Sequence, residues 1–344
     1  MTMNNFESFY KKSNTLEVCV ILFDKCNLCC EFCFENHSHL RTCEQILKST
    51  HKLIDQLNEL KTKRREITNF VFRFWGGELF MDILPDEYIK CYKQMVDLLQ
   101  NWCISNKFTS EFCFSTNLIF KNVERIKKFI NYNKNCYIAT SYDPISRFHS
   151  NTEEIWWKNV EIFNPKVISI TLTKECIEKY ITTDILFRLK KYELYPEYYI
   201  YNKNWQKYAP SEEDLFNFYK FCYLNDIDNI KEITKIFESY ENPIGRYCIC
   251  RNSCSFINDK LVFSCLLRSG TMSMIKEYGM TEEECYDNEN CTKKQFEIAT
   301  NNLKCFDCKY YSFCRLPCMA SKMHKNSKTS NCALKMFYGW LREN

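Results

Sequence analysis

Hydrophobic residues in the first 200 positions alternate between two kinds of segment. Short runs of apolar, β-branched and aromatic residues are typical of buried strands. Six such runs lie at Val18–Phe23, Asn69–Phe74, Glu111–Thr116, Cys136–Ser141, Val167–Leu172 and Tyr198–Tyr201. The pattern therefore predicts six strands in the first part of the chain.

Helical patterns separate these runs. The clearest follows Thr42 and Gln45, which stand at capping-box spacing, and its apolar face comprises Ile46, Leu47, Leu53, Ile54, Leu57 and Leu60. Pro85 begins a second helix, and others are predicted over Val123–Ile130, Glu153–Phe163 and Glu175–Leu189. Alternating strands and helices predict an α/β fold with a parallel sheet and right-handed crossovers, either open or curled into a barrel.

The pattern changes after residue 210. Ser211 and Asp214 have capping-box spacing before a helix predicted over Leu215–Leu224, and a second helix is predicted over Ile227–Tyr240. Beyond these helices the chain has many cysteines and short irregular segments. We therefore predict two domains, 1–241 and 242–344.

Composition narrows the possible functions. The net charge of +4 gives no indication of a nucleic-acid partner. The six glycines include no G-x-G, which rules out a dinucleotide fingerprint and a P-loop. No apolar stretch approaches the roughly 18 residues that a membrane-spanning helix needs, so no membrane partner is expected.

The 23 cysteines are the most unusual feature. Such a content indicates disulfides, metal or cluster ligands, or reactive thiols. Disulfide scaffolds are usually short and secreted, whereas this chain is long and its polar start, Met1–Lys12, lacks the apolar segment of a signal peptide. We therefore expect reduced, largely metal-bound cysteines in a cytoplasmic protein. Cysteines within strand or helix patterns are expected in the core, namely Cys19, Cys91, Cys113, Cys136, Cys176 and Cys222.

The first cysteine motif directly follows the first predicted strand. Cys26, Cys30 and Cys33 have the spacing C-x3-C-x2-C, which random placement of the cysteines gives about 0.1 times per chain. Three thiolates on a tight loop can hold three irons of a 4Fe–4S cluster and leave the fourth iron open to substrate or cofactor. Cys29 breaks the spacing, and a register that uses Cys29 in place of Cys30 stays open.

This motif resembles that of the radical S-adenosylmethionine (SAM) superfamily, because Asn27 and Leu28 follow its first cysteine and aromatic residues flank its third. A second marker, Gly76-Gly77-Glu78, follows the second strand. It resembles the superfamily's G-G-E motif, whose backbone and carboxylate bind the amino group of SAM. Adjacent glycines are expected where backbone approaches a ligand closely. A plain strand-to-loop turn is the alternative.

Two weaker matches end the next two strands. Ser115 and Asn117 belong to a segment that resembles the family's T-N-G, with Leu118 in place of the usual glycine. Ser141 and Asp143 resemble its S-x-D. In the family these strand ends contact the ribose and carboxylate of SAM, so the resemblance implies that these residues bind the cofactor.

The strongest cysteine signal lies near the end of the chain. Its spacing is C-x2-C-x5-C-x3-C-x13-C, and it comprises Cys305, Cys308, Cys314, Cys318 and Cys332. Random placement of its first four positions is expected roughly 0.007 times. Further cysteines precede it at Cys248, Cys250, Cys254 and Cys265. Together they resemble the SPASM extension of radical SAM enzymes. Lys260 stands where that pattern has glycine, and we expect the turn at Asn258–Asp259 to form without it.

The resemblance implies two auxiliary 4Fe–4S clusters with interleaved ligands, hence three clusters in all. The residues that match the second auxiliary cluster are Cys305, Cys308, Cys314 and Cys332. Cys265 and Cys318 would join upstream cysteines on the first. Which of Cys248, Cys250 and Cys254 complete it stays open. Two zinc sites, each held by four thiolates, are the alternative.

The resemblance also implies a fold and an activity. The fold is a partial (β/α)6 TIM-like barrel followed by a cysteine-rich, mostly irregular SPASM domain. SAM would bind across the barrel mouth, and its reductive cleavage would give a 5′-deoxyadenosyl radical that takes hydrogen from a substrate. Members with two auxiliary clusters mostly modify peptides or proteins. We therefore expect a peptide or protein substrate and an electron donor such as flavodoxin or ferredoxin.

Among the activities that the resemblance implies, we expect a ribosomal-peptide maturase that forms a thioether or C–C crosslink. Only Met1–Glu17 precedes the first predicted strand, so leader binding is expected to use the barrel, the extension or a separate protein. An anaerobic sulfatase-maturase-type Cys/Ser dehydrogenase and oxidation of a small molecule are alternatives. A non-catalytic iron–sulfur electron-transfer protein is an alternative of another class, against which the G-G-E match argues.

Overall fold

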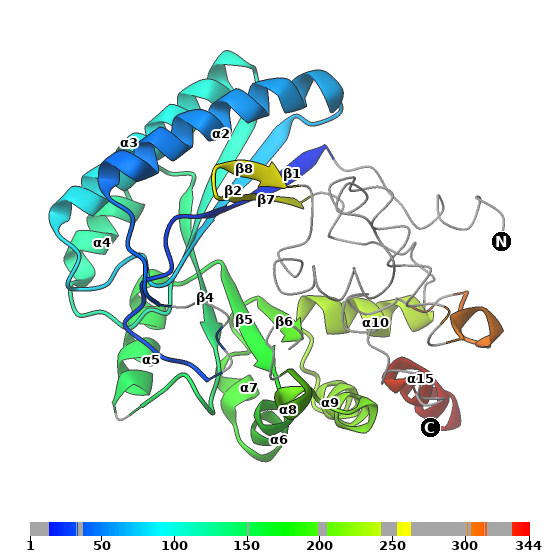
Figure 1. Cartoon of the computed structure of the whole chain (residues 1–344). Coiled ribbons are helices and arrows are strands. Elements are labelled where there is room, and N and C mark those ends of the chain that lie inside the picture. The colour runs from blue at the N-terminus through cyan, green and yellow to red at the C-terminus, as the bar shows by residue number, and fades with distance from the viewer. Residues whose placement is uncertain are drawn as a thin grey trace.

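A twisted, mostly parallel sheet organises the chain (Figure 1). The computed structural model describes residues 14–31, 33, 37–149, 151–198, 205–241, 253–262, 301, 304–312, 314 and 332–344. Within these residues, eight strands form one sheet in the order β6-β5-β4-β3-β2-β1-β7-β8. Their bounds are β1 Thr15–Ile21, β2 Asn69–Trp75, β3 Thr109–Ser115, β4 Cys136–Tyr142, β5 Val167–Leu172, β6 Leu194–Tyr198, β7 Ser253–Ile257 and β8 Lys260–Val262.

The first six strands pair in chain order and are all parallel. The helices between them follow one another along the outside of the sheet (Figure 1). They are α2 Cys43–Lys63, α3 Asp86–Ser105, α4 Val123–Ile130, α5 Thr152–Phe163, α6 Lys174–Thr182 and α7 Ile185–Arg188. Since β6 and β8 are the two ends of the sheet, the barrel does not close. The predicted partial (β/α)6 barrel is confirmed.

The two faces of the strands have different chemistry. In β2, Phe70, Phe72 and Phe74 are buried and belong to the core. The alternate residues Arg73 and Trp75 face a cavity inside the barrel. The hydrophobic pattern thus identifies the helix-facing side of the sheet, and the positions between are left to line the interior. All six cysteines that were expected in the core are buried.

The helix predicted over 227–240 begins only at Lys231, and the first strand lies at Thr15–Ile21 rather than Val18–Phe23. Two further elements differ more strongly. The sixth strand lies at Leu194–Tyr198, earlier than predicted, because Pro196 and Glu197 interrupt its apolar pattern. Proline is tolerated there since β6 ends the sheet. The helix predicted over Glu175–Leu189 is two helices, α6 and α7, because Thr183 is extended and Asp184 stands at the N-cap of a new helix.

The later segments pack on the barrel rather than apart from it. They are α8 Trp205–Tyr208, α9 Glu212–Leu224, α10 Lys231–Glu241, the short 3-10 helix η2 Cys305–Asp307 and α15 Ala333–Glu343. The rings of Phe337 in α15 and Tyr219 in α9 lie 6.2 Å apart, and the Ala333 amide donates to Glu212. Strand β7 extends the sheet beside β1. The sheet therefore crosses the predicted boundary between 241 and 242.

None of the helices in the described ranges is both long and apolar enough to cross a membrane.

Candidate active site at the carboxyl ends of the strands

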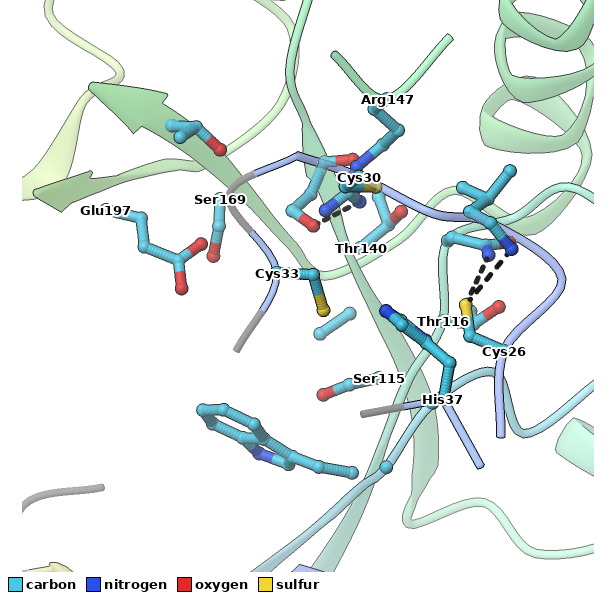
Figure 2. Close-up of a pocket in the computed structure, with 18 of the residues that line it drawn as sticks. Cys26, Cys30, Cys33, His37, Ser115, Thr116, Thr140, Arg147, Ser169 and Glu197 are labelled. Carbon is cyan, nitrogen blue, oxygen red and sulfur yellow. Dashed lines mark hydrogen bonds between the residues drawn. The ribbon is translucent and has the colours of Figure 1, made fainter. Parts of the chain in front are cut away.

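The cysteine loop that follows β1 lines a cavity of about 220 Å³. Figure 2 shows Cys26, Cys30 and Cys33 around this cavity. The Leu28 amide and the Asn117 side chain donate to the Cys26 sulfur, at 3.4 Å and 3.8 Å. Burial raises the pKa of Cys26 to about 12 and also raises that of Cys30. Three thiols that face one cavity, one of them beside two N–H donors, are suited to bind an iron–sulfur cluster, which holds cysteine as the thiolate.

Gly76 and Gly77 bring the end of β2 against the start of the cysteine loop. The Gly77 amide donates to the Phe23 carbonyl at 2.8 Å, and the amide that follows it donates to the Lys25 carbonyl at 2.9 Å. A Cβ on Gly76 would lie 2.2 Å from the Phe23 oxygen, and one on Gly77 1.8 Å from the Lys25 oxygen. Only glycine permits this approach. Both glycines line the cavity, so they shape the loop as well as its wall.

Glu78 does not line the cavity and is completely buried. Its carboxylate accepts hydrogen bonds from the Phe80 amide at 2.8 Å, the Thr116 hydroxyl at 2.7 Å and the Asn117 amide at 2.6 Å. Burial raises its pKa, although these three donors oppose the change. Glu78 therefore ties the end of β2 to the end of β3. Its contact with the amino group of SAM stays a prediction.

The end of β3 is tied in turn to the cysteine loop. Ser115 and Asn117 both line the cavity. The Asn117 side chain donates to the Asn27 side-chain oxygen at 2.8 Å, and Asn27 donates to the Ile119 carbonyl at 2.8 Å. Leu118, where the family motif has glycine, has a φ of 57°. This left-handed conformation explains why glycine suits the position, and here a leucine adopts it.

The end of β4 forms a turn around a buried carboxylate. Ser141 lines the cavity, whereas Asp143 is buried beside it. The Asp143 carboxylate accepts from the amides of Ile145 and Ser146, at 3.0 and 2.7 Å, and from the Cys176 thiol at 3.2 Å. Asp143 thus shapes the turn, and cofactor contact by its side chain stays a prediction.

Arg147, which the sequence motifs did not identify, extends from that turn into the cavity. One terminal nitrogen donates to the Ser141 carbonyl at 3.0 Å and to its hydroxyl. Its Nε is buried and has no hydrogen-bond partner among the described residues. A guanidinium that lines a cavity is suited to bind a carboxylate there. Its only sequence signal is a cation four residues after Asp143.

Other cavity residues were also missed by sequence reasoning. They are His37, Arg73, Trp75, Ser169, Thr171 and Glu197, from the cysteine loop, β2, β5 and β6. In a sequence, polar residues that face the barrel interior cannot be told apart from the polar residues that alternate along a strand with one solvent-facing side. Only the strand pairing brings Thr171 beside Glu197 and turns both toward the cavity.

Comparison with models of known protein families found no match, and comparison with curated proteins found none. Among solved structures, anSMEcpe with bound AdoMet and the Cp18Cys peptide aligns with a TM-score of 0.61 at 16% identity, over 96% of each chain. A histidine-tagged form of anSMEcpe with bound AdoMet gives 0.60 at 17% identity, over 95% of this chain and 97% of that one. SuiB from Streptococcus suis gives 0.51 at 14% identity, over 92% and 77%.

The chain has the fold of radical SAM enzymes. In that fold, the cavity described above occupies the carboxyl ends of parallel strands, where α/β proteins generally bind ligands.

The SPASM-like cysteines lie partly within the described residues. Cys305 begins η2 and Cys308 directly follows it, Cys314 lies further along the chain, and Cys332 precedes α15. In the described ranges, no three cysteine, histidine or carboxylate groups are placed to share a single metal ion, and this includes Cys26, Cys30 and Cys33, which would each bind a different iron of a cluster. Cys254 is completely buried in β7, opposite Val18 of β1. Positions 248, 250, 265 and 318 lie outside the described residues.

Proposed function

We propose that this protein is a radical SAM enzyme that modifies a peptide. The observation that carries the proposal is the convergence on one cavity of Cys26, Cys30 and Cys33 with Gly76-Gly77 and Arg147. An electron carrier has no need of a cavity beside its cysteine loop, so this geometry favours an enzyme. The likeness in fold to enzymes solved with AdoMet and a peptide supports it.

The residues present fit both groups. Cys26, Cys30 and Cys33 would hold three irons of a 4Fe–4S cluster, and Arg147 would bind the SAM carboxylate. When bound, the cluster supplies the electron for cleavage of SAM to methionine and a 5′-deoxyadenosyl radical that takes hydrogen from the substrate.

The protein's own residues position these groups. Gly76 and Gly77 hold the cysteine loop against β2, and Glu78 fastens β2 to β3. Asn117 and Leu28 donate to the Cys26 sulfur, a contact that stabilises a ligating thiolate and influences cluster potential. Ser141 fixes one arm of Arg147. The cavity wall would thereby orient bound SAM and keep water away from it.

The extension is proposed to carry two auxiliary clusters. Cys305, Cys308, Cys314 and Cys332 would bind the second. The burial of Cys254 in the core favours Cys248 and Cys250, with Cys265 and Cys318, for the first. A substrate radical that must lose an electron would find an acceptor here.

The substrate proposed is a ribosomal peptide in which a thioether or C–C crosslink forms. The fold it shares with SuiB is compatible with this assignment. The Cys/Ser dehydrogenase alternative stays open, because the fold shared with anSMEcpe, solved with AdoMet and the Cp18Cys peptide, is equally compatible with it. An electron donor of the flavodoxin or ferredoxin class is proposed for either.

The direct test is formation of 5′-deoxyadenosine from SAM by anaerobically reconstituted, reduced protein. Wild type should form it, and the combined replacement of Cys26, Cys30 and Cys33 by Ala should abolish it and remove about four irons per chain. Cys29→Ala, at an exposed cysteine of the same loop, is the matched control and should retain both. Loss of activity in Cys29→Ala with retention in a Cys30→Ala variant would show that the loop uses the other register.

A further inference from the structure

We propose that Glu197, on the β5–β6 wall of the cavity, binds a cationic side chain, lysine or arginine, of the peptide substrate. The inference rests on the proposed function and concerns the specificity of the same cavity. Glu197 would thus be a binding residue that selects the substrate by charge.

The position of Glu197 is the first observation. It lies on β6 opposite Thr171 of β5, and both residues line the cavity with Ser169. Figure 2 shows Glu197 and Ser169 on one side of the cavity and Cys26 and Thr116 on the other. Cys26 is beside Asn117 and hence beside the end assigned to SAM. Glu197 therefore faces the part of the cavity that remains for the substrate.

The partners of the other charged groups are the second observation. Arg73, which lines the cavity with Trp75, donates to Glu17 through Nε at 2.8 Å and Nη2 at 3.4 Å. This two-point pair neutralises both charges. The Glu78 and Asp143 carboxylates each accept several hydrogen bonds from their own strand ends.

Glu197 is different from these groups. Its side chain is open to the cavity, and no hydrogen bond or ion pair joins its carboxylate to any donor in the described residues. If Arg147 binds the SAM carboxylate and Arg73 stays with Glu17, Glu197 is the remaining unpaired charge of the described wall. Its neighbours Ser169 and Thr171 add hydroxyl groups that can accept further hydrogen bonds. A lysine or arginine side chain offers the positive charge and the several N–H donors that Glu197, Ser169 and Thr171 can accept.

The electrostatics of the barrel interior agree with this need for a cation. The surrounding protein raises the pKa of Glu197, Arg147 and Arg73 oppose this change, and the Asp143 carboxylate adds to it, while the side chain keeps exposed surface. A cation bound against Glu197 would favour the charged form of its carboxylate.

The test measures binding, independently of turnover. Dye-labelled peptides carry one cysteine and, one to four residues away, either lysine, arginine, norleucine or glutamate. Their affinity for the anaerobically reconstituted, SAM-loaded protein is measured by fluorescence anisotropy. Wild type should bind the best lysine or arginine peptide about tenfold or more tightly than the matching norleucine peptide. The variant Glu197→Gln should lose this preference, and Glu197→Lys should prefer glutamate.

Glu154→Gln, at an exposed glutamate of α5, is the control and should behave as wild type. SAM affinity without peptide, measured by equilibrium dialysis, should change less than twofold in both Glu197 variants. Weaker SAM binding by Glu197→Gln would place the residue in the cofactor site and overturn the inference. Equal binding of the lysine and norleucine peptides by wild type would also overturn the inference. The same holds if free lysine amide competes with the labelled peptide as strongly as the unlabelled peptide does. Failure of wild type to bind SAM would instead refute the proposed function.

Discussion

At the scale of single residues, the structure separates groups that face the cavity from groups that hold it in shape. Sequence motifs place Glu78 and Asp143 among the cofactor ligands. In the structure both are buried, and their carboxylates are occupied by donors from their own strand ends. Arg147, which no motif identified, lines the cavity, and its Nε has no hydrogen-bond partner among the described residues. A sequence motif thus identifies a residue that the site needs, but it does not tell whether that residue contacts the ligand or shapes the cavity.

Replacing Glu78 by Gln tests this distinction. The amide keeps the shape, but its NH2 must face either the Asn117 or the Phe80 N–H, which are both donors. We expect a loss of about 1–3 kcal/mol in the free energy of unfolding, because a buried donor is left unpaired. SAM affinity should also fall, roughly tenfold or more, with iron content unchanged. Urea unfolding and equilibrium dialysis measure the two effects, with Glu154→Gln as control. Unchanged values in both would contradict the role of the carboxylate.

Replacing Arg147 by Lys tests the carboxylate site. Lysine keeps the charge but loses the planar fork that reaches Ser141 and the cavity together. SAM affinity should fall about tenfold, and iron content should be retained. Arg188→Lys, at an arginine stacked on Trp157 away from the cavity, should bind SAM as wild type does. If SAM affinity is the same in both variants, Arg147 does not bind the cofactor.

At the scale of elements, the hairpin of β7 and β8 shows how the extension joins the barrel. Asn258 and Asp259 have φ of 50° and 62°, so the turn expected without the family's glycine does form. Asp259 accepts hydrogen bonds from Ser49 and from Lys52, at 2.7 Å for the latter, and pairs with Arg41 at 3.2 Å. Charged contacts therefore hold the hairpin against helix α2 and against Arg41, which precedes that helix.

This contact predicts a pH dependence. Partial burial alone would raise the pKa of Asp259, but hydrogen bonds from Lys52, Ser49 and Arg41 outweigh it and lower the pKa to about 2. Because the folded-state pKa is lowered, the stabilisation is complete above the ordinary value near 4 and is lost as pH falls toward 2. Asp259→Asn should lower the free energy of unfolding by about 1 kcal/mol at pH 6, after allowance for solvent screening, and by almost nothing near pH 2. Urea unfolding of both proteins measures this, with Asp55→Asn as control. A difference that is independent of pH would rule out the charge contact.

At the scale of the whole molecule, much of the barrel was predictable and the interior was not. The capping boxes at Thr42 and Ser211 and the helix Val123–Ile130 appear as predicted, because local sequence determines helix starts. The sixth strand was misplaced because Pro196 and Glu197 hide its period. Interior residues such as Arg73 and Glu197 are far apart in sequence, and only the pairing of parallel strands turns them toward one cavity.

The relation between barrel and extension also emerges only at this scale. The change in cysteine density predicted a boundary at 241, yet β7 pairs with β1 and α15 packs on α9. Buried contacts of this kind join segments that composition alone would separate. The described parts of the extension thus pack directly against the barrel. A change in the stability of one is therefore expected to change the stability of the other.

Anomalous X-ray diffraction from anaerobically grown crystals with SAM, recorded at the iron and zinc edges, tests the proposed cofactor site most directly. We expect an iron peak in the cavity surrounded by Cys26, Cys30 and Cys33, with SAM density between it and Arg147. We expect two further iron peaks in the extension, one of them among Cys305, Cys308, Cys314 and Cys332. Zinc in the extension would contradict the auxiliary clusters alone. A cavity without iron in crystals of fully reconstituted protein would show that Cys26, Cys30 and Cys33 do not hold a cluster.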